Sequence, residues 1–418
     1  MCQIIKKIAD NRQVVGYEKK IFYAVNNNYT NLIINTGCWG RTELSDLGLV
    51  TATGIDLEPD GNIRITVISI TPTGFGAKGE PEKSNSWIGT ATGKTLADAK
   101  NNLNETATKN LAWFHNRFII IGENFAKHGI GDIIDHLSRG RQFRYENKVL
   151  ITPTTAYDML TIPADVEKNL VLEIEGIVNS MKEEWSKVYV ENFKNILVNY
   201  CEKKSGFITG RIHYFKNENT TISTSRGDFN EAGSGERQQY VAAIKGSGVF
   251  MDEKLIGWID GDETQAYMLI KGKARNGVIT SRYNDGKDSL SYVFKRSKSK
   301  MKAEFDGNKI SFNIDIKMTG RIEVLYTEQN ILKEEEINKM EEAVSETVKH
   351  NLEKLIKKAQ EEFEVDFLGF GEYIFRRHPK RWKEIGDRWD EIFPYIEAKY
   401  DAQAKIDNSG IISKLVIN

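Results

Sequence analysis

The chain has 418 residues, and its 58 Lys and Arg stand against 59 Asp and Glu, which gives a formal net charge of −1 at pH 7. Hydrophobic residues make up 40% and charged residues 28%, a composition typical of a globular protein with two or three domains. The balanced charge argues against a protein that binds nucleic acid by neutralising phosphates. The cysteines, Cys2, Cys38 and Cys201, are too few for a disulfide framework and match no zinc spacing. No segment is apolar enough to span a bilayer as a helix.

Residues 1–37 lack both a sustained hydrophobic period and the apolar run of about 7–15 residues that a secretory signal needs. The sequence Thr36-Gly37-Cys38-Trp39 nevertheless places small residues directly before a cysteine, as in a lipoprotein cleavage site, where the freed cysteine is acylated. Asn35 stands where lipoprotein signals usually carry Leu, so the alternative is a buried or free cysteine near a ragged terminus. We expect residues 1–37 to be an atypical or degenerate signal region, and both interpretations of Cys38 stay open at this point.

The hydrophobic pattern predicts an N-terminal α/β domain over residues 38–203. Its strands show apolar runs or alternation, and the helix after Thr95 has a capping residue at its start. Expected strands are 49–56 and 63–70, joined by a turn at 58–61, and then 117–122 and 148–152. Expected helices are 95–111, 124–127, 131–138, 154–160, 163–188 and 189–203.

A middle domain of mainly antiparallel strands is predicted over residues 204–330, and a helical segment with a closing strand over 331–418. Expected elements of the middle domain are strands at 207–215, 241–251, 254–259, 277–282, 290–296, 301–305 and 309–319, a short helix at 263–270 and an exposed loop at 226–237. In residues 334–363 apolar side chains recur every three or four positions, which predicts one long amphipathic helix. A second helical stretch, 369–393, is broken at Pro379 and leads to a strand at 394–406. The pattern as a whole predicts an α+β fold of three mixed α/β domains with mainly antiparallel sheets.

Two short motifs could carry chemistry, and both have a simpler interpretation. Gly93-Lys94-Thr95 resembles the end of a phosphate-binding loop, but Ile88 stands where the first glycine belongs, so we predict a turn with Thr95 as a helix N-cap. Asp132 and His136 lie four residues apart on one helix face, but a metal site normally needs three or more ligands, so a capping Asp and a surface His are favoured. We therefore expect no catalytic residue, no cofactor and no metal site. The alternative is a soluble nucleotide- or metal-binding enzyme that uses these residues.

Aromatic side chains crowd the region after residue 369 at helical spacing, which favours a packed core over a binding platform. Cys201 lies late in an expected helix among apolar neighbours, and we expect its thiol to be buried and inert. The aromatic residues are Phe370, Tyr373, Phe375, Trp382, Trp389 and Phe393.

Four blocks of residues carry a further signal because they occur together and in order. The first is Gly37-Cys38-Trp39 with Arg41, Glu43, Leu44, Leu47, Val50 and Gly54-Ile55-Asp56, and the second is Ile121-Gly122-Glu123 with Ala126, Gly129, Asp135 and Arg139. The third is Gly246-Ser247-Gly248-Val249-Phe250 with Asp252, Lys254-Leu255-Ile256-Gly257-Trp258 and Glu263. The fourth is Asp366-Phe367-Leu368-Gly369-Phe370-Gly371-Glu372 with Pro379, Trp382, Trp389, Ile406 and Gly410. Spanning Gly37 to about Lys414, the set resembles the Ger(x)C family, the C subunits of spore germinant receptors.

The resemblance implies a three-domain mixed α/β protein that is tethered by lipid at Cys38 to the outer face of the spore inner membrane. There it would assemble with an A subunit and a polytopic B subunit in a complex that answers small germinants such as amino acids or sugars. The C subunit itself is not expected to be an enzyme, and lipidation becomes the favoured role of Cys38. A weaker option is that the chain senses a germinant directly.

Overall fold

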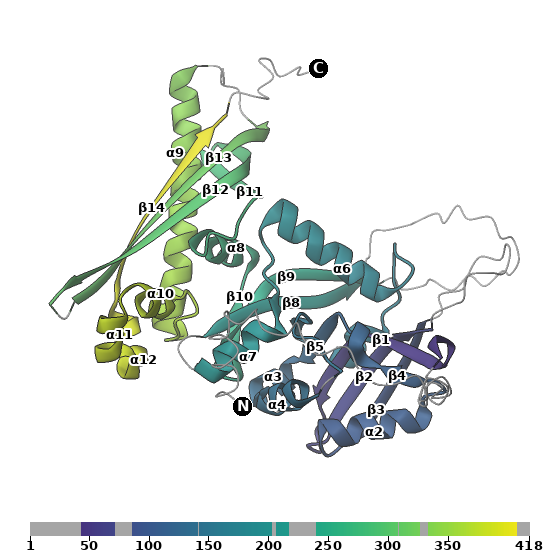
Figure 1. Cartoon of the computed structure of the whole chain (residues 1–418). Coiled ribbons are helices and arrows are strands. Elements are labelled where there is room, and N and C mark those ends of the chain that lie inside the picture. Colours follow the sequence, from purple (N-terminus) through teal and green to yellow (C-terminus); the bar gives the residue numbers. More distant parts are fainter. Residues whose placement is uncertain are drawn as a thin grey trace, which may run out of the picture.

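The computed structural model of the chain describes residues 43–71, 86–140, 142–202, 206–216, 240–307, 309–326 and 333–407. Two β-sheets with helices packed on them form this part of the molecule (Figure 1). The predicted α+β class, with mainly antiparallel pairing and a long helix near the C-terminus, is confirmed.

The first sheet has ten strands in the order β10-β9-β8-β6-β5-β1-β2-β3, with β4 paired to β1 and β7 paired to β6. Strand β5 lies between parallel neighbours β1 and β6 and is buried at every position, which explains its unbroken apolar sequence. Ile119 and Ile121 project to one face of the sheet, and Phe118 and Ile120 to the other. The strands are β1 Leu47–Leu57, β2 Ile63–Ile70, β3 Ser86–Gly93, β4 Asn110–Ala112, β5 Phe118–Gly122, β6 Lys148–Thr152, β7 Glu191–Asn192, β8 Phe207–Lys216, β9 Tyr240–Met251 and β10 Lys254–Ile259.

Helices cover both faces of the first sheet, so each face has its own apolar core. The core around Ile119 and Ile121 is covered by α2 Leu96–Thr106, α3 Glu123–His128, α4 Gly131–Arg139 and α7 Phe193–Glu202. The core around Phe118 and Ile120 is covered by α5 Ala156–Thr161 and α6 Leu170–Ser180.

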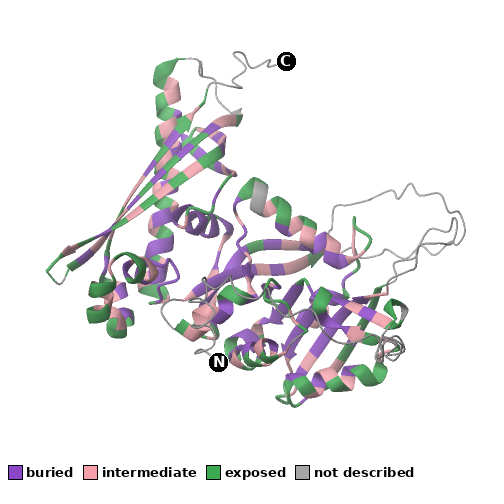
Figure 2. Ribbon diagram, viewed as in Figure 1, coloured by how far each residue is buried: buried purple, intermediate pink, exposed green. Residues whose placement is uncertain are grey.

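The second sheet has four strands in the order β11-β12-β13-β14, which are β11 Gly277–Tyr283, β12 Asp288–Asp306, β13 Lys309–Tyr326 and β14 Glu397–Ile406. Helix α9 Glu334–Lys357, continued by the π-helical turn η4 Lys358–Glu362, packs along one face of this sheet (Figure 1). The predicted apolar stripe lies in that contact, where Met340, Val344, Val348 and Leu352 are buried. The opposite face carries exposed side chains at alternate positions of β12 and β13 (Figure 2).

Strand β12 is longer than the sequence predicts, because residues 290–296 and 301–305 belong to one strand of 19 residues and not to two. The intervening Ser297 and Ser299 look too polar for a buried strand face. Their hydroxyls donate to the carbonyls of Ala274 and Ile270, in and just after the last turn of the preceding helix. Polar side chains are therefore satisfied on the inner face, while the lysines between them point outward.

Four further expected boundaries are wrong, each because pairing or packing overrides the local pattern. Gly93, the first residue of the turn expected before Thr95, belongs instead to edge strand β3, which pairs with β2. The helix after Thr95 ends at Thr106, because residues 110–112 pair with β1 as β4. The helix expected at 189–203 begins at Phe193, after β7. The linking helix expected at 163–188 is α6 followed by the π-helical turn η3 Met181–Trp185.

Helix α8 Gly261–Ile270 connects the last strand of the first sheet to the first strand of the second (Figure 1). Every residue of α8 except Asp262 is buried, so both sides of the molecule must cover it. Asp260 and Glu263 form a capping box at its start. The Glu263 carboxylate is 1% exposed and faces two lysines, Lys354 of α9 with its Nζ at 3.3 Å and Lys358 of η4 with its Nζ at 3.4 Å.

The expected domain boundaries do not coincide with the edges of the sheets. Strands β8, β9 and β10 join the first sheet, and β14 joins the second. Within the described residues, the chain passes from the first sheet to the second between Ile259 and Gly277, through α8. Division of the chain into domains at 203/204 and 330/331 stays a prediction.

Asp366 organises the segment after α9. Its carboxylate is 3% exposed and accepts backbone N–H groups of Gly369 at 2.7 Å, Phe370 at 3.1 Å and Gly371 at 2.6 Å. The indole of Trp389 donates to the same carboxylate at 3.0 Å. A Cβ on Gly371 would lie 2.7 Å from that indole nitrogen, so only glycine leaves room for the contact.

Asp366 therefore fixes the start of α10 Phe370–Arg377 and brings α12 Trp389–Ile392 against it. The predicted break at Pro379 is confirmed, because α11 Pro379–Ile385 begins there. Phe370, Trp389 and Phe393 are core residues as predicted, whereas Phe375 is 38% exposed.

Replacing Asp366 with Ala leaves these buried donors without an acceptor. We expect the free energy of unfolding to fall by about 3 kcal/mol in urea denaturation. Asp387→Ala, which removes an exposed acid of the same segment, is the matched control and should change it by less than about 0.5 kcal/mol. Equal stability of the two variants would contradict the role given to Asp366.

Burial raises the pKa of Asp366, although the N–H groups of Gly371, Phe370 and Gly369 act to lower it. With a raised pKa in the folded state, the stability that this carboxyl contributes is fully present below its unfolded pKa and is lost as pH rises through the folded pKa. The unfolding free energy of the wild type, measured relative to Asp366→Asn, should therefore fall as the pH rises above the usual pKa of a carboxyl group, 3.8. A difference that grew with pH would show that the pKa is lowered instead.

Candidate functional site

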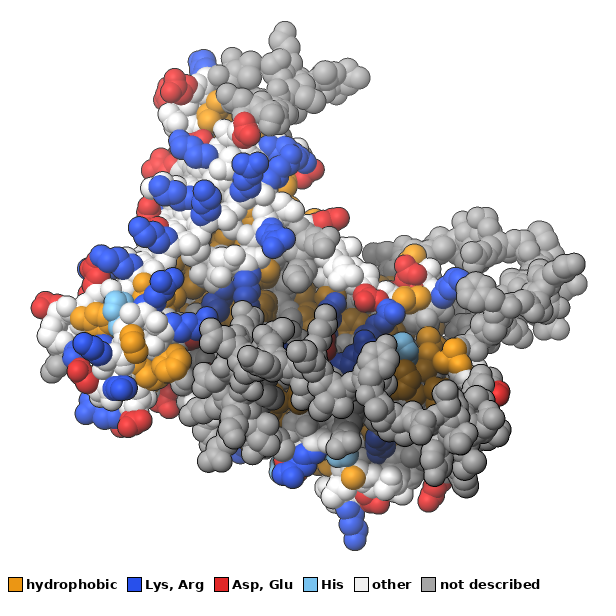
Figure 3. All heavy atoms as spheres, viewed as in Figure 1, with side chains coloured by type: hydrophobic (Ala, Val, Ile, Leu, Met, Phe, Trp, Pro, Cys, Tyr) orange, Lys and Arg blue, Asp and Glu red, His pale blue; other side chains and the backbone are white. Residues whose placement is uncertain are grey.

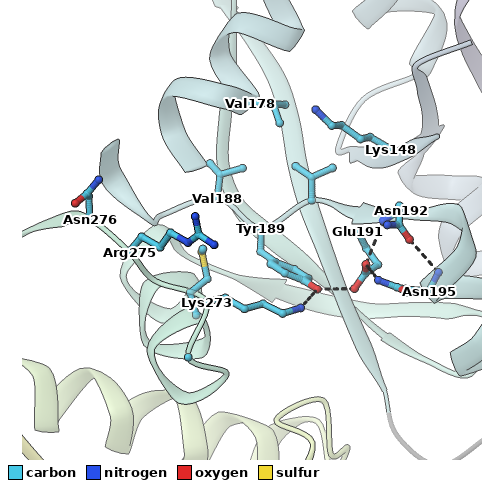
Figure 4. A pocket seen from close by; sticks show the side chains of 13 residues that line it. Lys148, Val178, Val188, Tyr189, Glu191, Asn192, Asn195, Lys273, Arg275 and Asn276 are labelled. Atoms are coloured by element: carbon cyan, nitrogen blue, oxygen red, sulfur yellow. Dashed lines mark hydrogen bonds between the residues drawn. The ribbon is translucent and has the colours of Figure 1, made fainter. Parts of the chain in front are cut away.

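A cavity of about 660 Å³ lies where the first sheet meets α8 and the segment that leads from it to β11. One side of the cavity is formed by β6, α6, β7 and the start of α7, and the other by Met268 and residues 272–276 (Figure 4). The cavity therefore joins parts of the chain that are far apart in sequence, and sequence patterns alone did not reveal it.

A hydrogen-bond network connects residues on the two sides of the cavity. The carboxylate of Glu191, which is 7% exposed, accepts the Tyr189 hydroxyl at 2.6 Å and the Asn195 amide at 2.6 Å. The ammonium of Lys273 donates to the same Tyr189 hydroxyl at 2.5 Å, as Figure 4 shows. The network thus links the first sheet to the segment after α8.

The cavity can hold a small solute but is poorly equipped for catalysis. Its lining brings Lys148, Lys273 and Arg275 together with one carboxylate, that of Glu191, so it favours a solute that carries negative charge. Burial, together with the nearby Tyr267 and Glu191, raises the pKa of Tyr189, which keeps the hydroxyl protonated at pH 7. The described lining residues include no histidine, cysteine or serine that could act as a base or nucleophile.

The two motifs singled out in the sequence meet in a second cavity of about 460 Å³. Lys94 and Thr95 line it from the start of α2, and Asp132 and His136 line it from α4. Burial and the charge of Lys100 lower the pKa of His136, so its imidazole is neutral at pH 7. The enzyme alternative requires that these residues lie together, as they do. The hydrogen bonds around them show whether they form a ligand site or cap a helix.

Those hydrogen bonds serve helix capping. Thr95 Oγ1 accepts the N–H of Asp98 at 3.1 Å, which confirms Thr95 as an N-cap, and Asp98 Oδ2 accepts the N–H of Lys94 at 2.9 Å. A Cβ on Gly93 would lie 2.3 Å from the backbone nitrogen of Ala99, so this glycine permits close packing of strand against helix. Across the described residues, no group of three or more His, Cys, Asp or Glu could hold a metal ion.

Of the three cysteines, Cys201 lies among the described residues, and Cys2 and Cys38 lie outside them. Cys38, the expected lipidation site, lies outside the described residues, as does the expected loop at 226–237. Cys201 is half-buried, which contradicts the expected full burial, because it lies in the last turn of α7 near the surface.

Residues of the four ordered blocks hold distant elements together. Asp56 is 3% exposed, and its carboxylate accepts the N–H groups of Ala156 at 2.7 Å and Tyr157 at 2.9 Å, at the start of α5. A Cβ on Gly122 would lie 2.2 Å from that carboxylate, so the first and second blocks meet here.

The second block also meets the third, because the indole of Trp258 donates to Glu123 at 3.1 Å. Contacts of this kind give these residues a structural role. Of the block residues, Asp135 and Arg139 line the second cavity, where they form an ion pair with each other at 2.8 Å.

Two family models match the chain in order. The model described as "Spore germination protein N-terminal domain" matches residues 40–214, and "Spore germination B3/ GerAC like, C-terminal" matches residues 245–410. Spore germination protein KC of Bacillus subtilis (strain 168) is 20% identical over 394 residues, which cover 91% of this chain and 94% of the relative. Spore germination protein B3 of the same organism is 23% identical over 403 residues, which cover 92% and 96%.

A solved structure supports the same fold. The crystal structure of the GerBC protein matches with a TM-score of 0.54 at 19% identity, covering 85% of this chain and 97% of that one. Among the helices in the described part of the chain, none combines the length and apolar character needed to cross a membrane.

Replacing Tyr189 with Phe removes the hydroxyl that bridges Lys273 and Glu191. We expect the free energy of unfolding to fall by about 1–2 kcal/mol, because the buried carboxylate of Glu191 loses a hydrogen-bond donor and the exposed ammonium of Lys273 loses this acceptor. Tyr395→Phe, at a side chain that is 89% exposed, is the control for the same chemical change. If both variants unfold at the wild-type denaturant midpoint, the network does not stabilise the junction.

Proposed function

Because the chain belongs to the Ger(x)C family, we propose that it is a non-catalytic lipoprotein subunit of a spore germinant receptor. The observation that carries the proposal is the ordered match of both family models, together covering residues 40–214 and 245–410. The chain takes part in spore germination and is associated with the spore inner membrane. It contributes contacts to the receptor and performs no reaction of its own.

We assign the membrane anchor to Cys38, which follows the small residues Thr36 and Gly37. Two acyl chains on the processed cysteine give stable membrane attachment where one chain does not. Glu43, where the described structure begins, lies only five positions after Cys38, so the extended chain between them reaches at most about 17 Å. The lipid therefore keeps the start of the first sheet close to the outer face of the membrane.

We assign the receptor role to contacts with the A and B subunits. Exposed apolar side chains support this, because protein interfaces bury aromatic and aliphatic surface at their centres. Trp87 is 37% exposed and Ile88 is 43% exposed, and both lie on β3 at the edge of the first sheet. An edge strand with apolar side chains is a ready surface for a partner subunit.

Replacing Cys38 with Ala should move the protein from the membrane to the soluble fraction of broken spores. Cys201→Ala removes the cysteine that lies within the family-matched residues 40–214 and should leave the protein with the membrane. Both fractions are washed in about 1 M salt, where the Debye length is about 3 Å, so that surface charge does not hold the protein. Unchanged membrane partitioning of Cys38→Ala after this wash would refute the anchor.

The enzyme alternative predicts a ligand in the cavity lined by Lys94, Thr95, Asp132 and His136. A ligand that binds the folded state raises the melting temperature by mass action. We expect neither ATP with Mg²⁺ nor Zn²⁺ alone to raise it, because the hydrogen bonds there cap a helix and a third metal ligand is lacking among the described residues. A saturable rise that Lys94→Ala or His136→Ala abolishes would revive the alternative.

A further inference from the structure

The face of the second sheet opposite α9 carries a row of basic side chains. Beyond the irregularity between Phe294 and Arg296, β12 alternates strictly. Arg296, Lys298, Lys300 and Lys302 are exposed on the outer face, and the residues between them face inward. On the neighbouring strand β13, Lys317 is exposed on the same face and lies directly opposite Lys298. Figure 3 shows Lys and Arg side chains gathered over this sheet.

Part of this charge is neutralised locally, and part is not. Lys302 pairs with Glu304 at 3.0 Å, and on β14 Lys399 pairs with Glu397 at 3.4 Å. Within the described residues, Arg296, Lys298, Lys300 and Lys317 have no acidic group within ion-pair distance. We call these four residues the basic face.

Lys298 and Lys317 occupy a register position that disfavours them. Like charges directly opposite one another on adjacent strands destabilise a sheet. An exposed acid is available two positions earlier on β13, but this residue, Asp315, lies opposite Lys300 and not opposite Lys298. A sequence selected for stability alone would place an acid at one of the two positions. The uncompensated pair therefore indicates that the face meets negative charge from outside the chain.

The composition of the basic face indicates which negative surface it meets. A protein interface usually has an apolar or aromatic centre and few lysines. The large hydrophobic side chains that are exposed elsewhere, such as Trp87 and Tyr395, have no counterpart among the described residues of this face. Three of the four unpaired cations are Lys, a compact point charge suited to phosphate groups without fixed geometry.

The spacing also fits a surface and not a point ligand. Alternate residues of a strand lie about 7 Å apart and neighbouring strands about 5 Å apart. Arg296 and Lys300 are therefore separated by about 14 Å along β12, with Lys317 beside the row. This is an open, flat array, unlike the enclosed cluster of donors that holds a single anion.

We propose that the basic face docks on the anionic phospholipid headgroups of a bilayer. It extends the proposed membrane location by a second contact, in the second sheet, far along the chain from Cys38. A polybasic patch adds electrostatic attraction to anionic lipids, independently of any acyl chain. The contact uses charge alone, so it requires anionic lipid and weakens with salt.

The test uses the full chain with Cys38→Ala, so that acylation plays no part and failure of the anchor proposal leaves this result unaffected. Its binding to phosphatidylcholine vesicles that contain about one third phosphatidylglycerol is measured by cosedimentation. Each lysine near an anionic surface contributes about fivefold in binding. Combining Lys298→Gln, Lys300→Gln and Lys317→Gln should therefore weaken binding by at least about tenfold.

The matched control removes the same charge from the first sheet region, by Lys168→Gln, Lys245→Gln and Lys254→Gln, all at exposed positions. It should change binding by less than about twofold, and vesicles of pure phosphatidylcholine should bind none of the proteins. The basic-face variant should melt no lower than the control, because it removes a like-charge pair.

Equal binding of the two triple variants, or equal binding to neutral vesicles, would overturn the proposal. The proposal would also be overturned if the chain with an intact basic face did not bind anionic vesicles, while the basic-face variant alone lost a copurifying acidic subunit. In that case the face is a protein-docking surface.

Discussion

Burial of Glu263 at the start of α8 is the constraint on which the union of the two sheets depends. A carboxylate that is 1% exposed needs compensation, and here it accepts the N–H of Asp260 at 2.7 Å and faces Lys354 of α9 and Lys358 of η4. The helix it caps is buried on nearly all sides, so neither sheet alone could cover α8. The single helix that connects the sheets is therefore also the core element between them.

The residues that identify the family act mainly through such joints. Asp56 caps α5, Trp258 bonds Glu123, and Asp366 gathers three backbone N–H groups and the indole of Trp389. These contacts join residues as many as 135 positions apart. Their role is structural, so the proposed function rests on the proposed anchor at Cys38 and on surfaces such as β3 and the basic face.

Local patterns predicted much of the fold and little of the site. The stripe through Met340, Val344 and Val348 predicted α9, and the turn at 58–61 predicted the first hairpin. The strand through Ser297 and Ser299 was missed because its polar inner residues are satisfied by carbonyls near the end of α8, which only the tertiary structure provides. The cavity was missed for the same reason, since Tyr189 and Lys273 are 84 residues apart. Lys94 and His136 were found separately, but their convergence depends on how α2 packs beside α4.

The central claim is that acylated Cys38 holds this non-catalytic scaffold at a membrane. The most direct measurement is the mass of the N-terminal peptide of the protein purified in detergent from dormant spores. The account predicts a peptide that begins at Cys38 and carries the added mass of a diacylglyceryl group. A peptide that runs unmodified through Cys38 from residues before it would contradict the account.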